Sequence, residues 1–540
     1  MHQVSNTRMT ASTPESSWRR AAVLAGAVFI LNAAVTFENI WPTPAVTWTG
    51  GASVELAVCL VALAIAGRNR SRSSSTAYLG WLSALWIVMA IGRYAEVTAP
   101  ALYGRDVNLY WDFRLLPDVA AMITRVAPWW LTTAVLLIVA FVVVLLFRLF
   151  RWCFRTVNGA MTSGSERRVL MLASAACVLV FGVQLITSRV AVVTTPVSAT
   201  YLRQVRLVAD GLGGSRTIPP SPSMDSSFAA IRGADVFLVF IESYGAVADR
   251  PDVASALEPA RARFETDIHS TGRGAVSAYV ESPTFGGSSW LAHISLLSGI
   301  EIRDPDSNAR LMTQHRETLV STFSHHGYRT IALMPGLRQK WPEGAFYRFD
   351  DIYGADRLAY RGPEFGWFAL PDEFTLAQFD HLEAAAPRGP RFVVFPTIST
   401  HFPFSPTPPY QSDWSRMLDQ KPYDGPAIVR AYARQPDWTN FTPGYIEAMS
   451  YDLAVLGGYL KQHADRDLVM ILLGDHQPPA AVSGEGASWN VPVHIVASRR
   501  PLLDDFLRLG FQEGVHAHGP SVAKMHALVP LLLKAFDGHE

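Results

Sequence analysis

The sequence predicts an α-helical membrane domain followed by an α/β domain with a mostly parallel central sheet. The 540 residues are 49% hydrophobic and only 17% charged, which is too apolar for an ordinary soluble protein of this length. This apolar excess is concentrated in roughly the first 190 residues. Further along the chain, continuous apolar runs alternate with helical patterns, and this alternation is typical of α/β domains.

Five apolar stretches predict membrane spans, because each is near the ~20 residues that cross about 30 Å of hydrocarbon, although the second is short. They cover residues 20–40, 51–66, 78–97, 129–150 and 169–187. Any one of them has a buried core helix as its alternative, but five in succession favour a membrane domain. The first follows Arg19 and Arg20 without a small-residue cleavage site, which indicates an uncleaved anchor rather than a signal peptide.

The basic residues predict the orientation of these spans. They precede span one, separate spans two and three, and separate spans four and five: Arg8, Arg19, Arg20; Arg68, Arg70, Arg72; Arg148, Arg151, Arg155, Arg167, Arg168. The positive-inside rule places all three groups in the cytoplasm. With five spans, the chain after about residue 188 lies on the far side, which in a bacterium is the periplasm or the cell exterior. We therefore expect a multi-pass protein of the inner (cytoplasmic) membrane.

Polar residues at the outward ends of the spans have two interpretations, simple interfacial solvation or contact with lipid head groups. They are Glu38, Asn39, Glu55, Arg93 and Glu96, together with the loop 104–114.

Composition sets the domain organisation and excludes some partners. We predict a transmembrane domain over 1–188, a connector over 189–232 that ends in a Pro/Ser-rich segment, and a catalytic domain over 233–540. Basic and acidic residues both number 46, so net charge indicates neither nucleic acid nor an acidic partner. All three cysteines lie in or beside apolar segments of the first domain, so the catalytic domain has no disulfide framework or thiolate metal site.

The catalytic domain reads as alternating strands and helices. Continuous apolar runs predict parallel strands buried on both faces at 236–241, 330–334, 392–395 and 468–473. Helical patterns lie between them, as at 319–326 and 445–463. In such sheets, ligands bind beyond the carboxyl ends of the strands.

A Gly/Ser-rich loop that turns into an apolar helix occupies residues 282–299. Ser288 and Ser289 lie where the helix begins, and the positive end of the helix dipole favours an alkoxide or a phosphate there. The alternative for either serine is a plain N-cap.

Polar side chains follow three of the predicted strands. Glu242 follows the first, His401 comes after the strand at 392–395, and Asp475 and His476 close the strand at 468–473. Singly, each has a structural explanation as a solvated strand end, a packed loop residue or a turn former. Together they supply carboxylates and imidazoles that suit a divalent metal such as Zn²⁺ or Mn²⁺, with Mg²⁺ as an alternative. Such a metal would lower the serine's pKa and neutralise a phosphate.

These pieces resemble the alkaline-phosphatase/sulfatase superfamily, and in particular its membrane-anchored lipoteichoic acid synthases and lipid A phosphoethanolamine transferases. The resemblance rests on the segments 239–243, 400–404 and 473–476 and on the serine run. It implies that Glu242, Asp475, His476 and the nucleophile bind the metal. It further implies that His401 binds substrate or a second metal. It also implies that Arg338, Lys340 and Trp341 lie against the phosphate.

The resemblance leaves the choice of nucleophile open between neighbouring serines. Segments 289–293 and 296–299 match the pattern of nucleotide pyrophosphatases without a gap and select Ser289. The lipoteichoic acid pattern Gly-Lys-Thr-Ser selects Ser288 instead. We favour Ser289, with Thr284 as a distant third candidate.

The sequence also departs from the family. Sulfatases convert a Cys or Ser to formylglycine, usually with Pro or Ala two residues later and Arg four later, whereas Leu291 and His293 stand there. Sulfate-ester hydrolysis is therefore disfavoured. The further histidines that could complete a two-metal site are His494, His516 and His518.

The function implied is that of a metal-dependent transferase with a phospho-serine intermediate. It would move a phosphoryl-alkyl head group from a phospholipid donor to a glycan or lipid-linked acceptor, with the chain as a monomer. The alternative is a membrane-anchored phosphodiesterase, phosphatase or sulfatase-like hydrolase with water as acceptor, and a rival of another class is a non-catalytic membrane scaffold.

Overall fold

The computed structural model divides the chain into two compact units, which are described separately. Residues 1–100 and 106–214 form the first unit, and residues 101–105 and 215–540 form the second. The division thus falls inside the predicted connector, whose first half contains the helix α7 (Pro196–Gly213). The structure describes residues 14–41, 43–48, 50–66, 75–103, 106–109, 112–113, 129–187, 193–213, 217–338, 341, 343–385 and 389–538. The basic residues Arg8, Arg68, Arg70 and Arg72 lie outside them.

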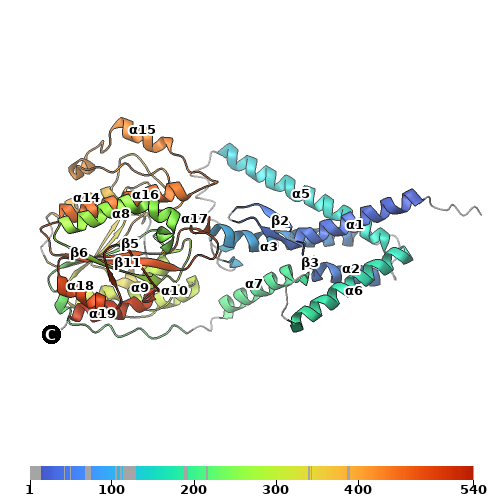
Figure 1. Cartoon of the computed structure of the whole chain (residues 1–540), viewed down its shortest axis with the longest axis horizontal. Coiled ribbons are helices and arrows are strands. Elements are labelled where there is room, and N and C mark those ends of the chain that lie inside the picture. The colour runs from blue at the N-terminus through green and yellow to red at the C-terminus, as the bar shows by residue number, and fades with distance from the viewer. Residues whose placement is uncertain are drawn as a thin grey trace, which may run out of the picture. The chain divides into compact units, whose positions relative to one another are not determined.

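The first unit is built from apolar helices, drawn in blue to green in Figure 1. Four of its described helices are long and apolar enough to cross a membrane, and these stretches are Trp18–Thr36, Ala77–Leu102, Trp129–Ala160 and Gly164–Ile186. They belong to α1 (Pro14–Thr36), α3 (Ser75–Tyr103), α5 (Trp129–Ala160) and α6 (Gly164–Thr187). Four of the five predicted spans therefore correspond to helices of sufficient length.

The remaining predicted span is a shorter helix. It is α2 (Val54–Ala66), whose 13 residues extend about 20 Å, less than the ~30 Å of hydrocarbon. The helix begins late because Ala52–Ser53 form a short strand, β3, which pairs with β4 (Val193–Thr194). The Ser53 hydroxyl then accepts a hydrogen bond from the Leu56 amide at 3.2 Å, as an N-cap does.

The polar residues at the predicted outward ends hold the first unit together. Glu55 accepts hydrogen bonds from the amides of Val197 and Ser198, at 3.2 and 2.9 Å, and so caps the N-terminus of α7. Arg93 pairs with Glu38, and the short strand β1 (Phe37–Asn39) pairs with β2 (Val46–Trp48). These contacts give the polar residues a structural role within the described part of the unit.

The second unit contains a central sheet of nine described strands, in the order β12-β6-β11-β10-β5-β9-β7-β8, with β13 paired to β6. Five neighbouring strands are parallel, namely β10 (Leu468–Gly474), β5 (Asp235–Ile241), β9 (Arg391–Pro396), β7 (Arg329–Met334) and β8 (Asp351–Gly354). The antiparallel edge comprises β11 (Asn490–Ala497), β6 (Gly274–Glu281) and β12 (Gln512–Glu513), and β13 (Ala523–Lys524) runs parallel to β6. The predicted fold class, a helical membrane part followed by an α/β domain with a mostly parallel sheet, is confirmed.

Helices cover both faces of this sheet (Figure 1). On one face lie α8 (Pro251–Ser270), α14 (Asp372–Glu383) and α16 (Thr442–Gln462), and on the other lie α9 (Ser289–Ser298), α18 (Arg500–Arg508) and α19 (Leu528–Asp537). Alternate residues of β5 enter the two cores: Val236, Leu238 and Phe240 pack in one, and Phe237, Val239 and Ile241 in the other. A strand buried on both faces is apolar throughout, which explains why this run has no polar alternation.

The shorter helices connect these elements. They are α10 (Pro305–Met312), α11 (Leu319–His325), α12 (Gly344–Tyr347), α13 (Ala355–Leu358), α15 (Gly425–Ala433) and α17 (Ala480–Ser483).

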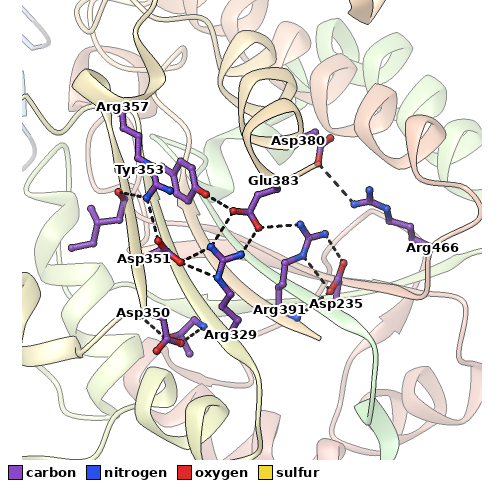
Figure 2. A network of polar contacts seen from close by, with 12 residues as sticks. Asp235, Arg329, Asp350, Asp351, Tyr353, Arg357, Asp380, Glu383, Arg391 and Arg466 are labelled. Atoms are coloured by element: carbon purple, nitrogen blue, oxygen red, sulfur yellow. Dashed lines mark hydrogen bonds and ion pairs between the residues drawn. The ribbon is translucent and has the colours of Figure 1, made fainter. Parts of the chain in front are cut away.

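A network of ion pairs joins the amino ends of four parallel strands (Figure 2). Asp235, Arg391, Arg329 and Asp351 are the first residues of β5, β9, β7 and β8. The buried carboxylate of Glu383, at the end of α14, lies 2.7 Å from Arg329 and 3.6 Å from Arg391. This network ties the strands together at the edge opposite their carboxyl ends, where ligands bind in such sheets.

Candidate active site

The candidate site lies where β5 and β10 end side by side. Ile241 and Gly474, the last residues of these parallel strands, are register partners. The residues that follow them, Glu242 on one strand and Asp475 and His476 on the other, therefore meet at one edge of the sheet.

The Ser289 hydroxyl completes the group. Its Oγ lies 3.0 Å from Glu242 Oε2 and 3.1 Å from His476 Nε2. His476 Nε2 in turn lies 3.5 Å from Glu242 Oε1 and 3.6 Å from Asp475 Oδ2. The structure thus brings together four residues that the sequence analysis had selected from three separate segments.

Backbone groups fix the orientation of these side chains. The amides of Ser243 and His476 donate to Asp475 Oδ1 at 2.8 and 2.7 Å. The Nδ1 of His476 lies 2.8 Å from the carbonyl of Gln477. Because a carbonyl only accepts, Nδ1 carries a proton, and Nε2 faces Ser289 and the carboxylates. Burial alone would lower the pKa of His476, but the charges of Asp475 and Glu242 raise it.

The turn before α9 selects which serine reaches this group. Gly286 and Gly287 have φ values of 67° and 144°, and Ser288 follows in the left-handed region at φ 64°. Ser288 is the N-cap residue of α9, but its side chain makes no capping bond. Thr284 donates to the Gly287 carbonyl at 2.6 Å and so supports the turn. Ser289 is the one of these three whose hydroxyl contacts Glu242 and His476 in the described structure.

The chemistry of this donor set fits a divalent cation. Glu242 and Asp475 are 7% and 1% exposed, and no lysine or arginine of the described residues pairs with either of them. Burial, and then the charge of Glu242, raise the pKa of Asp475 to about 6, against smaller lowering effects of His476 and His293. One ligand atom from each of Glu242, Asp475 and His476 lies within 4.8 Å of the other two, so the three side chains are grouped as ligands of one metal ion would be.

His401 lies on the loop that follows β9. Its Nδ1 is 2.7 Å from the Phe402 carbonyl, so Nδ1 carries the proton and Nε2 keeps its lone pair. The ring lies edge-on to Phe368, with centroids 5.0 Å apart. Burial lowers the pKa of His401 to about 4, and the nearby charges of His476 and Asp475 have smaller, opposing effects. The imidazole is therefore neutral at pH 7.

Of the three residues predicted to face the phosphate, one lies beside the residue whose ring contacts His401, one does not contact the four-residue group in the described structure, and one is outside the described residues. Arg338 follows β7 and donates to the carbonyl of Phe368, the residue whose ring contacts His401. Trp341 packs near Tyr347, with ring centroids 5.6 Å apart, and makes no contact with the four-residue group in the described structure. Lys340 lies outside the described residues.

The three additional histidines are not part of the four-residue group. Both ring nitrogens of His494 are engaged in the core, by Ser277 at 2.6 Å and by Tyr244 at 3.1 Å. The rings of His516 and His518 stack on each other, and His516 lies 3.8 Å from Glu258. Among the described residues, the group able to hold a metal consists of Glu242, Asp475 and His476.

Sequence reasoning missed a second pair of carboxyls beneath the site. Asp372, at the start of α14, accepts hydrogen bonds from the amides of Ile398 and Ser399, at 3.0 and 2.7 Å. Asp452 of α16 is close enough to interact electrostatically with Asp372, and Thr400 of the same loop donates to Asp452 at 3.4 Å. Burial raises the pKa of both groups, and the charge of Asp372 further raises the pKa of Asp452. This pair anchors the loop that carries His401, and no motif marks either residue because each lies within an ordinary helix.

The comparison with protein families decides the class of this domain. The sulfatase family model matches residues 295–494. The chain carries a sulfatase-family domain. The match contains His401, Asp475 and His476 and begins after Ser289. It confirms the predicted superfamily and an enzyme of the sulfatase-like class, although no functionally curated protein matches the chain in sequence.

A solved membrane-protein structure shares the fold of the chain. The chain is similar to the integral membrane lipooligosaccharide phosphoethanolamine transferase A (EptA) of Neisseria meningitidis, at 12% identity and a TM-score of 0.50, over 96% of this chain and 95% of EptA. Two partial likenesses are the lipoteichoic acid synthase LtaP of Listeria monocytogenes (15% identity, TM-score 0.35, 54% of this chain and 71% of LtaP) and the phosphoglycerol transferase GacH of Streptococcus pyogenes with sn-glycerol-1-phosphate (12%, 0.36, 63% and 81%). At these identities the likeness to EptA shows the fold alone.

Proposed function

We propose that the protein is a metal-dependent transferase that moves a phosphoryl-alkyl head group from a phospholipid to a glycan or lipid-linked acceptor of the cell envelope. The observation that carries this proposal is the position of Ser289 Oγ, 3.0 Å from Glu242 and 3.1 Å from His476. The fold shared with EptA, a phosphoethanolamine transferase by name, supports transfer rather than sulfate-ester hydrolysis.

Ser289 is the proposed nucleophile. In the first half-reaction its Oγ bonds to the donor's phosphorus, and the bond from phosphorus to the diacylglycerol oxygen breaks. In the second, an acceptor hydroxyl bonds to the same phosphorus and Ser289 is released. The covalent intermediate divides one difficult displacement into two easier ones, and the N-terminal end of α9 favours the developing negative charge.

Glu242, Asp475 and His476 would hold the metal together with Ser289. We propose Zn²⁺ or Mn²⁺, with Mg²⁺ as the alternative, because the set mixes carboxylate and imidazole donors. When bound, such an ion supplies positive charge that favours the ionised serine and a phosphate.

We assign substrate binding to His401 and Arg338, and to His401 a second role. Its neutral imidazole has a free lone pair on Nε2, which suits accepting the proton of the acceptor hydroxyl in the second half-reaction. A ring without a proton on Nε2 can act there as a general base but not as a general acid, because a general acid must carry the proton that it donates.

The proposal places the protein in the bacterial inner membrane with the sulfatase-family domain in the periplasm. That orientation needs an odd number of crossings, so α2 and its flanking residues must cross in addition to the four long helices. A chain with its native cysteines replaced by serine, carrying Ser255→Cys or Ser165→Cys, tests this with an impermeant maleimide on spheroplasts. We expect labelling at position 255 and protection at 165, and the reverse would refute the orientation.

The function is tested by mass spectrometry of the purified full-length protein after exposure to phosphatidylglycerol or phosphatidylethanolamine. We expect a phosphoryl-alkyl adduct on Ser289, and its absence from a Ser289→Ala variant. Head-group-labelled lipid then distinguishes the acceptors, because label in glycan indicates a transferase and label only in solution indicates the hydrolase. If the metal-loaded protein forms no adduct and cleaves no lipid, the proposed function is wrong and the non-catalytic scaffold is favoured instead.

A further inference from the structure

A groove of about 740 Å³ lies between α3 and α5 of the first unit. Six of its nine lining residues are apolar or small, namely Ala84, Ile87, Val88, Val143, Val144 and Phe147. The other three are arginines of α5, Arg148, Arg151 and Arg155. Their spacing of three and four residues places them on one face of the helix.

The two helices are antiparallel where they border the groove. The Tyr78 hydroxyl of α3 donates to Asn158 of α5 at 2.6 Å. The rings of Trp86 and Phe154 meet edge-to-face, 5.5 Å apart. The beginning of α3 therefore lies beside the end of α5, and these contacts hold one wall of the groove against the other.

The groove arginines have no carboxylate partner among the described residues. Arg93 and Arg203 of the same unit pair with Glu38 and Glu96. The Nε atoms of Arg151 and Arg203 are both buried without a hydrogen bond within the described structure, but Arg203 has carboxylate partners for its other nitrogens and Arg151 has none among the described residues. Burying a guanidinium nitrogen without a hydrogen-bond partner costs free energy. An anion from outside the chain would supply the hydrogen-bond acceptors and the negative charge that the groove arginines do not find in the described structure.

The depth of the arginines matches the phosphate layer of a membrane. The 32 residues of α5 extend about 48 Å, so some 18 Å of the helix exceeds the ~30 Å of hydrocarbon. The three arginines lie in its last 13 residues, at the basic end that the positive-inside rule places in the cytoplasm.

We propose that this groove binds an anionic phospholipid of the cytoplasmic leaflet. The phosphate contacts Arg148, Arg151 and Arg155, and an acyl chain lies along Val143, Val144 and the facing residues of α3. Basic pockets between membrane helices recognise anionic head groups in this way. The inference is independent of the proposed transfer reaction, whose residues all belong to the second unit.

Native mass spectrometry of the full-length protein in detergent tests the site, with phosphatidylglycerol as the probe and phosphatidylcholine as its zwitterionic comparison. The test variant is Arg148→Gln/Arg151→Gln. The matched control is Arg167→Gln/Arg168→Gln, which removes the same charge from the same end of the unit without touching the groove. We expect phosphatidylglycerol binding to fall at least about tenfold in the test variant and less than about twofold in the control.

A second variant separates the site from general surface charge. Ala84→Phe fills the groove and keeps every arginine, so it should also weaken phosphatidylglycerol binding if the variant elutes as an intact protein. Equal losses in the test and control variants, equal binding of the two lipids, or full binding by Ala84→Phe would each overturn the proposal.

Discussion

The Oγ of Ser289 lies 3.1 Å from the Nε2 of His476, although 187 positions separate the two residues in the chain. His476 follows the buried strand β10, and Ser289 begins α9 after the antiparallel strand β6. The carbonyl of Gln477 orients the imidazole, and the Gly286 amide donates to that same carbonyl at 3.0 Å. One backbone carbonyl therefore supports both partners, so the serine and the histidine are positioned as a unit.

Ser289→Ala should abolish turnover, because it removes the only one of the three candidate hydroxyls that contacts Glu242 and His476 in the described structure. We expect phospholipid cleavage to fall at least about 10³-fold, as for a nucleophile that acts through a covalent intermediate. The measurement is release of head group from labelled lipid by the purified, metal-loaded protein.

Ser288→Ala is the matched control, since it deletes the neighbouring hydroxyl, which caps nothing. It should retain activity within about fivefold. A loss as large as that of Ser289→Ala, together with an adduct on position 288 in the parent chain, would reassign the nucleophile.

Asp475→Asn should weaken metal binding and, in the absence of metal, should stabilise the folded protein. The metal-free parent holds two buried carboxylates near each other, so neutralising one should raise its thermal midpoint by a few degrees. Added Zn²⁺ or Mn²⁺ should stabilise the parent, because the ion binds the folded state, and should have little effect on Asp475→Asn. A thermal melt with and without metal, paired with metal analysis, checks both. An equal response of parent and variant to metal would contradict the assigned ligands.

Much of this architecture could be predicted because its signals are local. The strands at 236–241 and 468–473 are continuous apolar runs, and the polar residues directly after them fall at the ligand-binding edge by a general rule of parallel sheets. The likeness to a family then pointed to a serine at the start of a helix. Ile241 and Gly474 are register partners, and this pairing brings the polar residues that follow the two strands next to each other.

Other features depend on contacts that no local pattern records. Asp372 of α14 and Asp452 of α16 are buried carboxyls whose pKa values are both raised by burial, and neither belongs to a motif. The predicted second span is the short helix α2, because Ala52 and Ser53 pair with β4. Each of these two residues lies 141 positions before its partner in the chain. Ser288 and Ser289 were hard to separate in sequence, because the left-handed φ of Ser288 decides which hydroxyl points inward.

Glu383→Gln should destabilise the second unit, because it leaves Arg329 and Arg391 without the carboxylate that lies between them (Figure 2). Glu383 is buried, and removing one partner of a buried ion pair costs about 3 kcal/mol when the other charge is left alone. That value is an upper bound here, because Arg329 keeps Asp351 and Arg391 keeps Asp235. We expect the thermal midpoint of the full-length protein to fall by several degrees. Asp504→Asn is the control, because its pair with Arg500 is exposed and is worth under about 1 kcal/mol. Similar midpoints for the two variants would show that the network does not stabilise the strands.

Glu373 should make the stability of the second unit fall as pH rises. The side chain is fully buried, and burial raises its pKa from 4.5 to about 8, against a smaller opposing effect of the Gln411 amide. Between these two values the folded chain holds a proton that the unfolded chain releases, so each pH unit lowers the unfolding free energy by about 1.4 kcal/mol through this group. Glu373→Gln, which stays neutral, removes that contribution. The midpoint of the variant minus that of the parent should therefore grow from pH 5 to pH 8 and level off above it. A difference that stays constant over this range would show that Glu373 is ionised in the folded protein.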